Sequence, residues 1–166
     1  MQRSHRAVPG LVAFCFFISG AAGLVYQLAW MRYLALFLGH TSYAVMAVLA
    51  AFMGGLAIGN ALSGRIADRA AKPLALYAWL EVGIGLYALI FPVYYAACGT
   101  GYVELAKAWQ PGTGGLFALK LGFSLLLLLI PTVCMGATFP VMTRYVTRSL
   151  AELRGRVAWL YAINSA

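Results

Sequence analysis

Four long stretches without a charged side chain constrain the fold of this chain more than any other feature. They cover residues 7–31, 33–64, 82–103 and 121–143. Each is longer than the ~20 residues that an α-helix needs to cross the hydrocarbon core of a bilayer. The sequence therefore predicts an all-α fold, a polytopic transmembrane helical bundle.

Composition supports this class. The chain is 63% hydrophobic and only 10% charged, whereas a soluble domain usually carries about 25% charged residues. A net charge of +8 would suggest a nucleic-acid partner in a soluble protein. Here the charges lie between apolar stretches, so we expect the lipid bilayer and no nucleic acid as the partner.

We expect a single membrane domain over residues 1–166, with full spans at 8–34, 42–62, 74–97 and 116–142. A polar, glycine-rich loop over residues 98–115 would join the third span to the fourth. Residues 157–166 read as the start of a fifth span, which indicates truncation at the C-terminal end. The basic N-terminus is like that of a secretory signal, but the apolar stretch after it is too long, so we interpret it as a retained first span.

The distribution of Lys and Arg predicts the orientation, because cytoplasmic loops carry an excess of them. Nine of the twelve would lie on one side of the membrane, and Arg32, Lys107 and Lys120 on or near the other. The N-terminus is therefore expected in the cytoplasm. The nine are Arg3, Arg6, Arg65, Arg69, Lys72, Arg144, Arg148, Arg154 and Arg156.

No cofactor, metal site or catalytic residue is predicted, so the chain does not read as an enzyme. Its three cysteines, Cys15, Cys98 and Cys134, show no CxxC spacing and suggest neither a disulfide framework nor a metal site. The Gly-Thr-Gly sequence at residues 99–101 lacks the preceding strand that a nucleotide-binding loop requires.

Small residues form a stripe on the second span, where Gly55, Gly59 and Ser63 are four apart. Such a stripe lets another helix approach closely in lipid, where packing drives association. Helix packing is the interpretation that we favour, and the lining of a substrate path is the alternative. Pro131 and Pro140 in the fourth span are expected to bend it.

The sequence "GRIADR", which follows the second span, resembles the signature Gly-x-Leu-Ala-Asp-Arg-x-Gly-Arg-Lys of the major facilitator superfamily. The resemblance implies that Gly64, Asp68 and Arg69 form a cytoplasmic latch, an ion-pair and helix-end network that holds one conformation. The chain departs from the signature at Ala71 and Pro73. A loop that only sets topology is the alternative.

A second resemblance extends from about residue 16 to residue 166. The segments "FFISGAAGLVYQLAWMRYLALFLGHTSYAVMAVLAAFMGGLAIGNALSGRIADR", "LYAWLEVGIGLYALI", "PTVCMGATFPVM" and "GRVAWLYAINSA" are similar to the membrane half of bacterial fused spermidine synthase-like proteins. In that family a facilitator-like helical domain precedes a soluble aminopropyltransferase domain.

That resemblance implies a domain of the bacterial inner (cytoplasmic) membrane that anchors the enzyme or transports a solute linked to polyamine-type metabolism. It also implies further helices of the same domain and a fused soluble enzyme domain as partners. Any aminopropyl transfer would then lie beyond residue 166. The alternative is part of a major-facilitator-type secondary transporter with no enzyme domain.

Three polar residues within the spans are the candidate intramembrane site: Glu81, Gln27 and Arg32. Charge is expensive in lipid, and an ionisable residue there suggests function. Glu81 lies about two turns into the third span, at ~12 Å depth. It is either a protonatable or cation-binding acid, or a structural acid paired with a base or a backbone group on a neighbour. Gln27 would hydrogen-bond another helix, and Arg32 would reach the interface.

Overall fold

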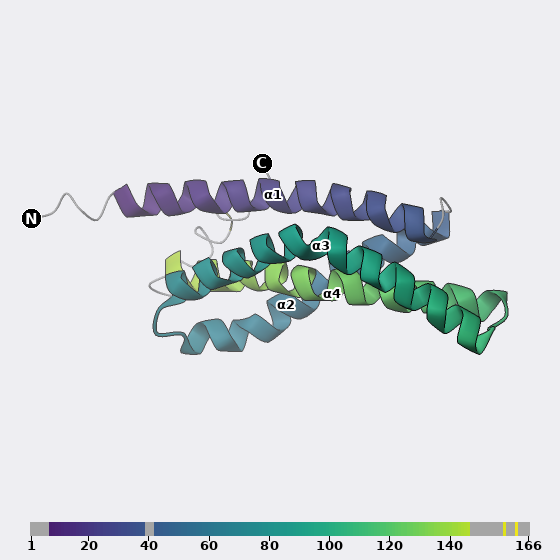
Figure 1. Cartoon of the computed structure of the whole chain (residues 1–166). Coiled ribbons are helices and arrows are strands. Elements are labelled where there is room, and N and C mark those ends of the chain that lie inside the picture. Colours follow the sequence, from purple (N-terminus) through teal and green to yellow (C-terminus); the bar gives the residue numbers. More distant parts are fainter. Residues whose placement is uncertain (1–6, 39–41, 147–157, 159–161, 163–166) are drawn as a thin grey trace, which may run out of the picture.

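A computed structural model of the chain describes residues 7–38, 42–146, 158 and 162. Four helices run back and forth through it: α1 (Ala7–Leu38), α2 (Ser42–Arg69), α3 (Pro73–Trp109) and α4 (Thr113–Val146). Figure 1 shows that α1 and α3 run in one direction and α2 and α4 in the other. The predicted start of a fifth span at 157–166 lies almost entirely outside the described residues.

All four helices are long and apolar enough to cross a membrane. The predicted fold class, an all-α bundle of membrane-spanning helices, is confirmed, and the chain is a multi-pass membrane protein. The beginning of α1 and the turn between α2 and α3 lie at the same end of the bundle, on the left in Figure 1.

The helices are longer than the predicted spans, and the loop predicted over residues 98–115 is wrong for its first twelve residues. There α3 continues to Trp109 and ends at Gln110, whose left-handed backbone (φ 42°, ψ 48°) directs its N–H to the carbonyl of Ala106. Residues 104–108 are all good helix formers, and Lys107 pairs with Glu104 one turn away at 3.0 Å. Gly99 and Gly101 are therefore helical residues and do not mark a loop.

The α2–α4 interface is the closest packing in the bundle, and the small-residue stripe of α2 forms it. A Cβ added to Gly55 would collide with Thr132 Oγ1, and one added to Gly59 would collide with the backbone carbonyl of Val133. On the α4 side of the interface, a Cβ added to Gly136 would likewise collide with the backbone of Leu56. The predicted packing role of the stripe is confirmed.

A tyrosine links α3 to the proline-bearing part of α4. The Tyr87 hydroxyl donates a buried hydrogen bond of 2.6 Å to the carbonyl oxygen of Leu127. Four residues further along α4 stands Pro131, which has no N–H to give to that carbonyl. Tyr87 thus supplies the donor that the proline removed, and it does so from a neighbouring helix.

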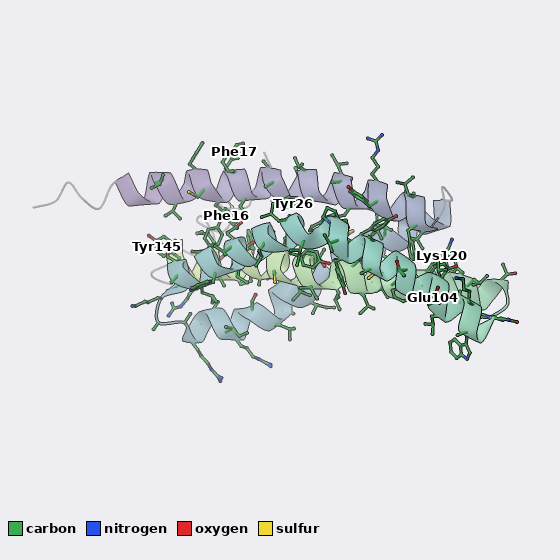
Figure 2. The ribbon with its side chains drawn as sticks, viewed as in Figure 1. Phe16, Phe17, Tyr26, Glu104, Lys120 and Tyr145 are labelled. Atoms are coloured by element: carbon green, nitrogen blue, oxygen red, sulfur yellow. The ribbon has the colours of Figure 1, made fainter. Side chains whose placement is uncertain are left out.

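Aromatic side chains hold the second half of α1 against α3. Trp30 contacts Phe91 at a centroid distance of 5.5 Å, Tyr33 contacts Tyr95 at 5.2 Å, and both Tyr33 and Phe37 meet α3 edge to face. Such pairs add stability beyond the area they bury. Near the start of α1, Phe16 points toward the bundle and Phe17 away from it (Figure 2).

Candidate functional site

A cavity of about 340 Å³ lies between α1 and the other three helices, all of which contribute to its wall. This volume falls at the small end of the ~300–1,000 Å³ range typical of ligand pockets, which are mostly apolar with a few polar groups. The polar side chains in the wall are Ser19, Tyr26 and Gln27 from α1, Glu81 from α3 and Thr138 from α4.

Glycines keep this cavity open. Gly20 and Gly23 of α1 and Gly85 of α3 line it without side chains. A Cβ added to Gly23 or Gly85 would meet no other atom within 4 Å. These glycines are therefore not required for close helix contact, and their effect is to leave volume beside the polar groups.

Glu81 is the acidic group among the residues that line the cavity. Ser19 donates a hydrogen bond of 2.5 Å from its Oγ to Glu81 Oε1, which joins α1 to α3. This length lies at the short end of the range for a hydroxyl that donates to a carboxylate. One hydroxyl fills only part of the acceptor capacity of a carboxylate, which has about four lone-pair positions. The carboxylate therefore keeps acceptor capacity for a further partner.

No base neutralises Glu81 within the part of the chain that the structure describes. The salt bridge found there joins Lys107 to Glu104, near the far end of α3. A half-buried carboxylate without an ion-pair partner is unfavourable unless hydrogen bonds, a cation or a proton compensate it. Neither of the structural partners expected for Glu81, a base or a backbone group on a neighbour, is seen among the described residues, where its partner is the side-chain hydroxyl of Ser19.

Tyr77 lies next to the hydrogen-bonded pair of Ser19 and Glu81. It precedes Glu81 by one turn, on the same face of α3. Its side chain is 6% exposed, and its hydroxyl has no hydrogen-bond partner among the described residues. Ser19 and Glu81 are its polar neighbours. A buried hydroxyl without a partner is unusual and needs an explanation, and here it adjoins the carboxylate that has capacity to spare.

The structure separates the three predicted intramembrane residues. Glu81 and Gln27 both line the cavity, and Gln27 lies eight residues beyond Ser19, which corresponds to ~12 Å along α1. Arg32 is exposed and does not line the cavity. Sequence reasoning missed Ser19 and Tyr77. The four-residue spacing of Tyr77 from Glu81 was a usable signal, but nothing in the sequence links Ser19 to a residue 62 positions away.

The residues of the predicted latch lie apart from this cavity, in the last two turns of α2. Asp68 and Arg69 are exposed and Gly64 is half-buried. Neither Asp68 nor Arg69 forms a salt bridge with another residue in the described ranges. Ala67, which directly precedes them in the sequence, is 1% exposed and packs in a cluster with Phe16 and Tyr77. The latch itself stays a prediction.

Metal binding finds no support in the described residues, where no three His, Cys, Asp or Glu side chains come together. Comparison with known proteins found no match to this chain among protein-family models, curated proteins or solved structures.

Proposed function

We propose that this chain is a membrane domain that binds a cationic solute within the bilayer at Glu81, as a step in transport. The observation that carries the proposal is a carboxylate on the wall of a 340 Å³ cavity. It receives one hydroxyl, from Ser19, and no base among the described residues pairs with it.

The physical reason is the cost of charge in a membrane. An ionisable residue inside a span is unfavourable by several kcal/mol, and such residues usually mark the path of a substrate or proton. An acid that serves only to hold α1 to α3 would not require open volume beside it. The cavity supplies that volume, and a bound cation supplies the missing charge.

The resemblance to spermidine synthase-like fusion proteins supports amines as the class of cation, since that family is linked to polyamine-type metabolism. It also supports a location in the bacterial inner membrane and a fused soluble enzyme domain as partner. The excess of Lys and Arg on one side supports a cytoplasmic N-terminus. The alternative, a secondary transporter of the facilitator type without an enzyme domain, is supported by "GRIADR" alone.

Uptake by the full protein in proteoliposomes tests the proposal, with radiolabelled putrescine and ethanolamine as probes. We expect Glu81→Gln to lower uptake of at least one probe by about tenfold or more, because loss of one ion pair costs several kcal/mol. Glu81→Asp should retain part of the uptake, since it keeps the charge.

Glu104→Gln is the matched control, because it removes an exposed acid from the same helix, remote from the cavity. Its uptake should equal that of the wild type. Equal uptake by the wild type and Glu81→Gln, at equal amounts of folded protein, would contradict transport at this site. It would leave the helices as a tether for a soluble domain.

A further inference from the structure

We infer that the cavity recognises one ammonium group, so that its ligand carries a single positive charge beside Glu81 and an uncharged polar group beside Gln27. The inference rests on the proposed function, and it adds the number of charges and the shape of the ligand.

Few acidic residues are available to neutralise a cation in this cavity. The chain contains four, and Glu81 is the one that lines the cavity. Asp68 and Glu104 are exposed near helix ends, and Glu152 lies outside the described residues. A second ammonium group in this cavity would be desolvated with no carboxylate beside it among the described residues, which is strongly unfavourable. The site therefore favours a monocation over a diamine of the same length.

The end of the cavity at Glu81 offers hydrogen-bond acceptors. An ammonium group offers hydrogen-bond donors and no acceptor. The oxygens of Glu81 accept such donors, and Ser19 Oγ, which donates its own proton to Glu81, keeps lone pairs to accept another. The adjacent Tyr77 hydroxyl has no partner among the described residues, and its oxygen can also accept a hydrogen bond. These acceptors favour an amine that bears N–H groups over a quaternary ammonium.

At its other end the cavity is lined by the neutral amide of Gln27. Gln27 is ~12 Å from Ser19 along α1, and its amide both donates and accepts hydrogen bonds without carrying charge. Apolar side chains also line the cavity, among them Leu56, Ile84 and Met135. Ile84 lies one turn beyond Glu81 on α3, which runs in the same direction as α1 from Ser19 to Gln27. An elongated molecule with an apolar middle and a neutral polar tail matches this sequence of surfaces. The volume equals that of roughly eleven liquid waters, which suits a small metabolite.

Calorimetric titration of the full protein in nanodiscs tests the inference with three ligands that share a chain of six carbon atoms. ε-Aminocaproamide has one charge and a neutral amide, hexamethylenediamine has two charges, and caproamide has none. We expect ε-aminocaproamide to bind at least about tenfold more tightly than either of the others, a difference of one 1.4 kcal/mol step in binding free energy. Glu81→Gln should abolish its advantage over caproamide, and Glu81→Asp should restore part of it.

Gln27→Leu tests the neutral end. It should reduce the affinity for ε-aminocaproamide and leave that for hexylamine, which has no tail amide, unchanged. If hexamethylenediamine binds as tightly as ε-aminocaproamide and still requires Glu81, the single-charge inference is wrong while the cation site stands. If ε-aminocaproamide does not bind, the inference is also wrong. The uptake difference between wild type and Glu81→Gln then decides separately whether the proposed function fails with it.

Discussion

The α2–α4 interface and the cavity beside α1 both contain glycines, and glycine has opposite effects in the two regions. At the interface, a side chain on Gly59 would strike the backbone of Val133 on α4. At the cavity, a side chain on Gly23 or Gly85 would meet nothing within 4 Å. The same residue type therefore brings two helices together in one place and holds space open in another. What decides the outcome is the distance of the neighbouring helix.

The polar groups of the two regions differ in the same way. At the interface, Thr132 donates to the carbonyl of Leu128 on its own helix at 2.7 Å, so its polar group is satisfied locally. At the cavity, Glu81 is held by Ser19 from a different helix and retains free acceptor positions. The first arrangement suits a fixed joint. The second suits a site that exchanges a ligand.

The largest expected difference between the regions comes from adding one methyl group to a glycine in each. Gly59→Ala should destabilise the protein by about 3 kcal/mol or more, because overpacking costs 1–3 kcal/mol and here the obstacle is backbone. Gly85→Ala should change stability by at most about 1 kcal/mol, with alanine favoured by its helix propensity. Unfolding in mixed micelles measures both, and equal losses would contradict the distinction.

A smaller effect is expected at the joint between α3 and α4. Tyr87→Phe leaves the buried carbonyl of Leu127 without its donor, which should cost about 1–3 kcal/mol. Pro131→Ala restores a backbone N–H that reaches the same carbonyl. Tyr87→Phe should therefore cost less in the Pro131→Ala background than in the wild type.

The double-mutant cycle for Tyr87 and Pro131 isolates this coupling, which should be about 1 kcal/mol. Tyr94→Phe, which changes a half-buried tyrosine on the same helix, is the matched control and should show no coupling to Pro131→Ala. Additive effects of Tyr87→Phe and Pro131→Ala would mean that the tyrosine and the proline act independently.

The two regions were not equally predictable from sequence. Gly55, Gly59 and Ser63 repeat every four residues within one helix, and that spacing was enough to predict the packing face. The cavity depends on which helices meet, and a contact between Ser19 and Glu81 leaves no periodic mark. Arg32 and Gln27 are near in sequence, but their different rotation around α1 places Gln27 in the cavity wall and leaves Arg32 exposed.

The smallest of these effects is expected at Ser19, where the cavity and the attachment of α1 coincide. Ser19→Ala removes the donor to Glu81, and hydrogen bonds to charged groups contribute about 1.5–3 kcal/mol when fully formed. We expect about 1 kcal/mol of destabilisation, because the remaining carboxylate is only half-buried and water entering the cavity can replace part of the bond. Ser19→Thr, which keeps the hydroxyl, should restore the wild-type stability.

Cation binding separates the two roles of Ser19. If Ser19 only fastens α1 to α3, Ser19→Ala lowers the melting temperature, and the affinity for ε-aminocaproamide stays unchanged. If it also accepts a hydrogen bond from the ammonium group, Ser19→Ala lowers that affinity and Ser19→Thr restores it. Because the effect acts through the ligand bound at Glu81, it should vanish in the Glu81→Gln background. A loss of affinity that persists without Glu81 would contradict the shared ammonium site, since Ser19 would then contact the ligand independently of the carboxylate.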